Sequence, residues 1–479
     1  MRLTHAALDL DGDRLLLETP QGSPVRFEIE VGGAGPGCPS RSLTIAGSGP
    51  SGRPILRRYD LPLRHQNGWL DLYEAVAGDF GVHLPLSRRP LPTPDFEAPY
   101  EPRLTEAASP EILYGYGDPS VLRVEEDGGP AWYLTATSND AANAFPILKS
   151  DDLETWRPEG FVFPEGRSPA WCLTGHDRAD FWAPEMHRVG GEYWLVFTAR
   201  ERDRTLAIGL ARAAQPAGPW TTLDRPLLSG GVIDGHIVQD ADGQPLLVWK
   251  EDRNEVWPRL LAGRLHQRPE LIARLFPDDA GRRAAALVAT LWPWIATLEP
   301  MEQFFVEQPL LEAVVDDYEG FGERLARAGP ELEDIAEALT TPIYIQALSA
   351  DGSALVGDRR VILVNDQPWE AHLIEGVWIT RQDGRYHAFY AGNDFSTWRY
   401  GIGTAVAEDP RGPWRKAPEP LLRSSADWWA PGHPSVATGP DGRPRLFLHA
   451  YRPGRMGYKV FRAMLSLPLT FEGDGVRIG

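Results

Sequence analysis

The chain has 479 residues, with 48 Lys and Arg against 67 Asp and Glu, which gives a formal net charge of −19. Such acidity argues against nucleic acid or an anionic membrane as a partner, because both bind clustered positive charge. The sequence has no apolar run long enough to cross a bilayer, no signal-peptide pattern in residues 1–5 and only two cysteines, so we expect a cytoplasmic protein without a disulfide framework or a zinc cluster.

Residues 1–84 have the pattern of β-strands. Between residues 25 and 31, apolar side chains alternate with Arg and Glu, which is typical of a half-buried strand. We predict an N-terminal β domain here, for which a sandwich is one architecture. Six prolines follow between residues 85 and 102, and this density excludes a helix or a central strand. Residues 85–108 are therefore predicted to be an extended linker.

Residues 109–479 contain a repeat. Five short segments each open a predicted strand, and their first residues are 64, 52, 141 and 58 positions apart. In the last three segments an Asp-Gly turn follows at a fixed offset. Repeats of about 58 residues that cannot bury their faces alone predict an all-β, five-bladed β-propeller. The first residues are expected at one mouth of the central channel, and they are Asp118, Trp182, Asp234, Glu375 and His433.

The one long spacing indicates an insertion in the third repeat. Residues 282–296 and 302–328 carry apolar side chains at helical intervals. On either side, residues 246–250 and 343–347 have the pattern of neighbouring strands of one blade. We therefore predict a helical insertion at 258–341. It is expected either to close over the site or to form a contact between copies of the chain in a homo-oligomer.

Five stretches in order and in register resemble glycoside hydrolase family 43, the family of five-bladed propeller arabinanases, arabinofuranosidases and xylosidases. The resemblance covers about residues 110–470 without the insertion. Two departures from the family pattern are Val377, where proline usually follows Glu-Gly, and the insertion itself. The matching stretches are Gly117-Asp118-Pro119-Ser120-Val121, Phe181-Trp182-Ala183-Pro184-Glu185, Ile233-Asp234-Gly235-His236, Ile374-Glu375-Gly376 and Pro431-Gly432-His433.

The resemblance implies inverting hydrolysis by three carboxylic acids. Asp118 would be the general base that activates water, and Glu375 the general acid that protonates the leaving oxygen. Asp234 would raise the pKa of the acid and orient it. Inversion needs the two catalytic carboxyls about 6.5–9.5 Å apart, which suits residues facing each other across a channel. Taken singly, Asp118 and Asp234 are also ordinary turn residues, whereas a buried Glu375 without a function would be costly.

Further residues are candidates for binding. The predicted substrate-binding residues are Phe181, Trp182 and His236. The alternative role of the two aromatic residues is to pack between blades. Glu185 is interpreted as structural or as a hydrogen-bond acceptor for a sugar. The resemblance implies that His433 reaches a metal on the propeller axis, often calcium, largely through waters. Its alternative role is that of an ordinary core histidine. No organic cofactor is expected.

The sequence thus predicts an enzyme whose partner is a carbohydrate. We expect cleavage of α-L-arabinofuranosyl or β-D-xylosyl linkages in short oligosaccharides or glycosides, with an exo-acting pocket. The alternative is a non-catalytic carbohydrate-binding or scaffold propeller, which Val377 and the insertion favour. The presence of all three acids argues for the enzyme, because a module that only binds sugar does not need a carboxylic acid that stays protonated near neutral pH.

Overall fold

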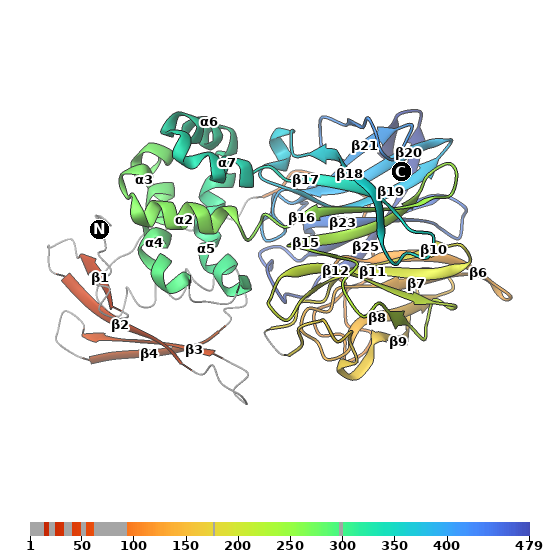
Figure 1. The fold of residues 1–479 in the computed structure, drawn as a ribbon, viewed down its shortest axis with the longest axis horizontal. Helices are drawn as coiled ribbons and strands as arrows, with labels where there is room; N and C mark the ends of the chain where they lie inside the picture. The colour runs from red at the N-terminus through yellow and green to blue at the C-terminus, as the bar shows by residue number, and fades with distance from the viewer. Residues whose placement is uncertain are drawn as a thin grey trace. The chain divides into compact units, whose positions relative to one another are not determined.

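The computed structural model describes residues 93–175, 178–296 and 300–479, together with the backbone of four N-terminal strands. The chain forms two compact units, and each is described by itself (Figure 1). The first unit contains residues 1–92 and 253–339. The second contains residues 93–252 and 340–479.

The N-terminal strands form one antiparallel meander. Its strands, in spatial order, are β1 (Arg14–Glu18), β2 (Pro24–Gly32), β3 (Arg41–Ser48) and β4 (Pro54–Leu61). The alternating segment at residues 25–31 lies within β2. These strands make a single sheet, so a second layer, which a sandwich needs, stays a prediction. Residues 62–92, which include the end of the predicted β domain and the start of the predicted linker, lie outside the described residues.

The first unit also contains six α-helices between β16 and β17. They are α2 (Trp257–Gln267), α3 (Glu270–Leu275), α4 (Asp279–Ile295), α5 (Pro300–Val315), α6 (Tyr318–Ala328) and α7 (Glu333–Ala338), with the 3₁₀ turn η2 (Pro330–Leu332). Residues 302–328, which carry apolar side chains at helical intervals, form two helices, α5 and α6, and the backbone leaves the helical conformation at Asp317 between them. The apolar residues at helical spacing, such as Leu310 and Val314, are fully buried. No helix among the described residues is long and apolar enough to span a membrane.

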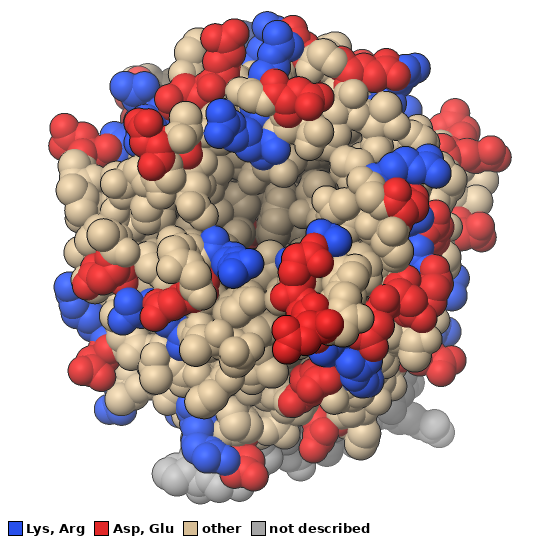
Figure 2. All heavy atoms as spheres, turned by 90° about the vertical axis from the view of Figure 1, so that its right-hand side faces the viewer, with Lys and Arg blue, Asp and Glu red and all other residues tan. Residues whose placement is uncertain are grey.

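Five antiparallel sheets, three of four strands and two of five, form the second unit. The first strand of β6–β9, β10–β14, β15–β18, β19–β22 and β23–β26 packs against the first strand of the next sheet, which closes the ring. This confirms the predicted five-bladed propeller. Figure 2 shows one end of it, with a central hollow ringed by side chains of both charges. The sheets are β6 (Ser120–Glu126), β7 (Gly129–Thr135), β8 (Ala144–Ser150), β9 (Arg157–Phe163); β10 (Trp182–Val189), β11 (Glu192–Arg200), β12 (Leu206–Ala213), β13 (Thr221–Thr222) with β14 (Leu228–Ser229); β15 (Val232–Gln239), β16 (Pro245–Glu251), β17 (Pro342–Leu348), β18 (Leu355–Val364); β19 (Ile374–Gln382), β20 (Arg385–Gly392), β21 (Gly401–Ala407), β22 (Arg415–Lys416); and β23 (Trp429–Thr438), β24 (Pro444–Tyr451), β25 (Ala463–Glu472), β26 (Gly475–Ile478).

Part of the predicted linker belongs to the propeller. Strand β5 (Glu101–Leu104) pairs with β25 and adds a strand to the fifth sheet. Pro102 is tolerated there because β5 lies at the edge, where one side of the strand needs no ladder hydrogen bonds. Two 3₁₀ turns, η1 (Pro164–Gly166) and η3 (Pro368–Glu370), complete the elements of this unit.

The third sheet carries the helical segment. Strands β16 and β17 pair with Lys250 opposite Ile343, as the sequence predicted for neighbouring strands of one blade. Lys250 also pairs with Ile233, the residue before Asp234. The helical segment therefore leaves and rejoins the sheet at the end where Asp234 lies.

Each sheet has a left-handed residue at or just before the start of its first strand, with φ between 45° and 56°, and β23 has a second one, Ala430. In four of the sheets a β-bulge accompanies it. The five residues are Asp118, Ala183, Asp234, Gly376 and His433, and the end of the propeller where they lie is called the mouth below. The sequence alignment of the repeats assigned Trp182 and Glu375 to the same repeat position as Asp118 and Asp234. That alignment was wrong by one residue in two blades, because matching residue types does not reveal a bulge.

Candidate active site

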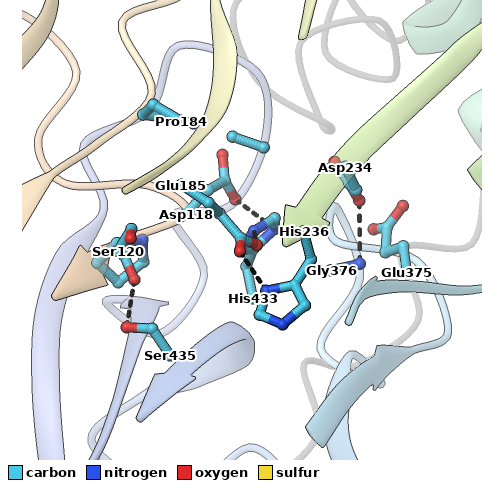
Figure 3. A network of polar contacts seen from close by, with 12 residues as sticks. Asp118, Ser120, Pro184, Glu185, Asp234, His236, Glu375, Gly376, His433 and Ser435 are labelled. Carbon is cyan, nitrogen blue, oxygen red and sulfur yellow. Dashed lines mark hydrogen bonds and ion pairs between the residues drawn. The ribbon is translucent and has the colours of Figure 1, made fainter. Parts of the chain in front are cut away.

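The three predicted catalytic acids lie together at the mouth. Asp118 comes from the first blade, Asp234 from the third and Glu375 from the fourth, and only 9%, 9% and 6% of these residues is exposed. The charges of Glu375 and Asp118 both raise the pKa of Asp234, so the three carboxyls share one electrostatic environment. Figure 3 shows them around the axis, with Glu185, His236 and His433 between them.

Asp118 is held as an ion. Arg462 donates from Nη1 to its Oδ1 over 2.9 Å, and the Thr137 hydroxyl donates to Oδ2. His433 Nδ1 lies 3.5 Å from Oδ1, and the backbone N–H of Asp118 donates to His449 Nδ1 over 3.1 Å. Burial opposes ionisation, but Arg462, His433 and His449 outweigh it and hold the pKa of Asp118 well below its usual range. A carboxylate of this kind stays charged through the whole neutral range.

Gly117 makes room for Arg462. A Cβ on residue 117 would lie 1.9 Å from the guanidinium carbon of Arg462. We expect Gly117→Ala to displace that guanidinium from Asp118, to cost about 1–3 kcal/mol of unfolding free energy, and to move the acidic limb of activity to higher pH. Urea unfolding and the pH profile check this. Gly128→Ala, where a Cβ would meet nothing within 4 Å, is the control and should change neither.

Glu375 is held by two donors from different blades. The Lys250 ammonium lies 2.9 Å from its Oε2, and the Tyr400 hydroxyl donates to its Oε1 over 2.9 Å. Burial opposes the charge on Lys250, but Glu375 and Asp252 outweigh it and raise the pKa of this lysine. The carboxyl therefore has a fixed orientation at the mouth.

Asp234 is the carboxyl that holds a proton. Its N–H donates to Thr198 Oγ1, and its Oδ2 accepts from the N–H of Gly376 over 3.0 Å. Burial above all, and then the charge of Glu375, raise its pKa to about 7, although His433 and Lys250 oppose the rise. The sequence predicted that Asp234 would raise the pKa of the acid. In the structure it is Asp234 itself whose pKa is raised, directly beside Glu375.

This raised pKa predicts the alkaline limb of the pH profile. A carboxyl with a raised pKa keeps its proton until the pH passes that value, so kcat/KM should fall as the pH rises above about 7. Asp118 sets no limb near neutrality because its pKa is low. Initial rates from pH 4 to 10 measure this. A plateau that continues to pH 9 would contradict it, and the exposed Asp242→Asn should leave the profile unchanged.

The two predicted stacking residues differ in their surroundings. Phe181 is 3% exposed, and its ring packs against Phe145 and Phe163 in the core. It therefore has the packing role that the sequence left open, and the structure does not place it against a substrate. Trp182 is partly exposed, donates from Nε1 to Asn139 Oδ1, and has the Arg200 guanidinium over its ring. Only Trp182 remains available for stacking.

The other two predicted binding residues lie deeper, on the axis. His236 is 1% exposed, and its ring nitrogens contact Glu185 Oε2 (2.7 Å) and the backbone of Ile379, so the structure does not place it where a sugar would touch it. His433 Nε2 lies 3.4 Å from Glu185 Oε1. Calcium binds six to eight oxygen atoms, whereas the groups that face His433 are two carboxylates, Asp118 and Glu185. These residues alone supply fewer oxygen atoms than calcium binds, so a calcium ion held largely through waters stays a prediction.

One side of the mouth is closed by the connection between β24 and β25. Its Tyr458 hydroxyl donates to Asp180 over 2.6 Å, and its Lys459 ammonium pairs with Asp140 over 2.7 Å. The Lys459 and Asp140 side chains are 1% and 0% exposed. Because Asp140 lies in the first blade and Asp180 immediately precedes the second, this connection ties three blades together.

Sequence comparison agrees with this architecture. The model of glycosyl hydrolases family 43 matches residues 108–274 and 332–477, which leaves out most of the helical segment. The chain belongs to glycoside hydrolase family 43. Members of this family are glycosidases, and inversion is typical of them.

Named relatives match parts of the chain, and solved structures share its fold. Xylosidase/arabinosidase 43B of Humicola insolens is 27% identical over 183 residues, or 37% of this chain and 30% of that protein. A putative β-xylosidase of Xylanibacter ruminicola is 28% identical over 106 residues, or 22% and 19%. The chain thus matches less than a third of these relatives' length. A thermostable family-43 glycoside hydrolase shares the fold with a TM-score of 0.53 at 24% identity, covering 76% of this chain and 93% of that one. The xylan β-1,4-xylosidase of Bacillus halodurans has a TM-score of 0.51 at 19% identity, covering 77% and 55%.

Several residues that hold the site were missed from the sequence. Lys250 lies in a strand that was predicted correctly, but its contact with Glu375 depends on the register between blades. Tyr400 and Arg462 come from connections outside the repeat motifs, and no local pattern marks them. The only available signal was Gly115-Tyr116-Gly117, where alternate glycines indicate a close approach of another group.

Proposed function

We propose that this chain is an inverting glycoside hydrolase that removes terminal α-L-arabinofuranosyl or β-D-xylosyl groups from oligosaccharides or glycosides. The observation that carries the proposal is that an ionised Asp118 lies at the same mouth as Asp234, whose raised pKa lets it hold a proton beside Glu375. Inverting hydrolysis needs one carboxylate as base and one carboxylic acid as proton donor. The names of the relatives support both sugars.

In the proposed mechanism the three carboxyls have separate tasks. Asp118, kept ionised by Arg462, accepts a proton from the attacking water. The pKa of Asp234 is raised to about 7, in part by the charge of Glu375, so Asp234 holds a proton beside Glu375 up to about that pH. Glu375, oriented by Lys250 and Tyr400, takes up this proton from Asp234 and delivers it to the leaving oxygen, and Asp234 regains a proton from solvent after turnover. No step in this mechanism runs through a metal ion.

Exo-action is proposed from the narrowness of the mouth. The three carboxylic acids are each less than a tenth exposed, so neighbouring groups leave little room around them. The β24–β25 connection encloses the side toward the first two blades through Tyr458 and Lys459. An enclosed site suits one terminal sugar better than the middle of a chain. The oligomeric state and the cellular location stay predictions from the sequence.

Hydrolysis of 4-nitrophenyl α-L-arabinofuranoside and β-D-xylopyranoside tests the proposal. We expect turnover of at least one, and single-sugar products from the matching oligosaccharides. The second candidate function, a non-catalytic binding propeller, is favoured by Val377, which stands where the family usually has proline. It predicts binding of these sugars without turnover, and affinity that survives the loss of Glu375.

A further inference from the structure

Behind the catalytic carboxylates, one carboxylate and three imidazoles meet in the channel. Glu185 Oε2 lies 2.7 Å from His236 Nδ1 and 3.3 Å from His187 Nε2, and its Oε1 lies 3.4 Å from His433 Nε2. Glu185 and His236 are each 1% exposed, and the His187 side chain is 11% exposed. The ligand-type atoms of Glu185, His187 and His236 all lie within 4.8 Å of one another.

Two atoms of this cluster form no hydrogen bond. Glu185 Oε1 and His433 Nε2 are both fully buried and have no hydrogen-bond partner among the described residues, although they form an ion pair with each other over 3.4 Å. His187 Nε2 accepts a long hydrogen bond from the N–H of Ile237 and lies 3.3 Å from Glu185 Oε2. Buried lone pairs that face each other are costly unless a cation lies between them.

One of the three distances between ligand-type atoms already suits a small divalent cation, and the other two, 2.7 Å and at most 4.8 Å, would adjust when the ion binds. Zinc bound to imidazole nitrogen and carboxylate oxygen at about 2.0–2.1 Å in tetrahedral geometry places neighbouring ligand atoms about 3.4 Å apart. The distance between Glu185 Oε2 and His187 Nε2, 3.3 Å, matches this value. His236 Nδ1 is closer because it donates a proton to Glu185 while Ile379 N–H donates to its Nε2. The Ile379 carbonyl, 3.2 Å from Nε2, would accept its proton once Nδ1 binds a metal.

We propose that Glu185, His187 and His236 bind one divalent ion of the zinc, cobalt and nickel class. Imidazole with carboxylate suits these ions and is unsuited to calcium, the ion that the family resemblance implied. Glu185 and His187 lie on β10 and His236 lies on β15, so the ion would link the second and third blades inside the channel. His433, from the fifth blade, faces the remaining carboxylate oxygen.

Metal content tests this directly. The full chain is dialysed against chelator, exposed separately to Zn²⁺, Co²⁺, Ni²⁺ and Ca²⁺, desalted, and analysed by mass spectrometry for bound metal. We expect about one equivalent of zinc, cobalt or nickel and no calcium. His187→Gln and Glu185→Gln are expected to abolish uptake. His387→Gln, at a buried histidine outside the cluster, should keep it.

Thermal unfolding separates loss of the site from loss of the fold. Zinc should raise the melting temperature of the wild type but not that of His187→Gln, while the two melt alike without metal. Failure of the wild type to take up any of the three ions would overturn the proposal. Calcium uptake that His187→Gln leaves unchanged would also overturn it. Because bound metal is measured without substrate, either failure leaves the proposed hydrolase function untouched.

Discussion

Replacing Glu375 by alanine is expected to lower kcat/KM by about 10²–10⁴-fold for a glycoside with a poor leaving group, such as a phenyl glycoside. The loss should be much smaller for a 2,4-dinitrophenyl glycoside, because that leaving group departs without a proton. Tyr400 and Lys250 both orient this carboxyl, so its removal takes away the positioned proton donor. Parallel kinetics with the two glycosides measure the difference.

Two controls accompany this variant. Alanine leaves the buried Lys250 without its nearest carboxylate, which lowers stability. Glu375→Gln keeps the volume and an acceptor for Tyr400, and it should melt closer to the wild type while losing the same activity. Glu408→Ala changes an exposed glutamate of an outer turn and should leave rates unchanged. Equal loss on both glycosides would show that Glu375 is not the acid.

Replacing Asp118 by asparagine is expected to lower kcat by about 10²–10⁴-fold on both glycosides. An activated leaving group does not help here, because the attacking water still needs a base. The variant should also lose roughly 3 kcal/mol of unfolding free energy, since a buried guanidinium, Arg462, loses its carboxylate. Steady-state kinetics and urea unfolding measure the two effects separately.

A double variant separates catalysis from stability at this pair. Asp118→Asn with Arg462→Met removes both charges, so part of the lost unfolding free energy should return. The rate should not return, because no carboxylate faces the water. Recovery of activity in the double variant would mean that Asp118 serves only to neutralise Arg462.

Much of the fold was predictable because it repeats. The Asp-Gly turns at 242–243, 383–384 and 441–442 join the first two strands of three blades, and each places a glycine in the left-handed region. An insertion lengthens only one of the intervals between repeats, so the helical segment could be located from the one interval that is longer than the others. The break at Asp317 could not be predicted, because apolar residues at helical intervals continue on both sides of it.

The site was predictable only in part. Asp118, Asp234 and Glu375 open repeats, and their shared position made them visible in the sequence. The environment of each carboxyl comes from elsewhere: Arg462 from a long connection and Lys250 from the second strand of a blade. For this reason the location of the proton, on Asp234 beside Glu375, could not be derived from spacing.

The configuration of the first product tests the central claim most directly. Proton NMR of the wild-type enzyme with 4-nitrophenyl β-D-xylopyranoside, recorded before mutarotation, should show α-xylose appearing first. That result requires a single displacement by water, with Asp118 as base and Glu375 as acid. If β-xylose appears first, the reaction passes through a covalent intermediate and the assigned roles are wrong. If only the arabinofuranoside is turned over, inversion predicts the β-anomer of arabinose first, and the α-anomer would contradict it.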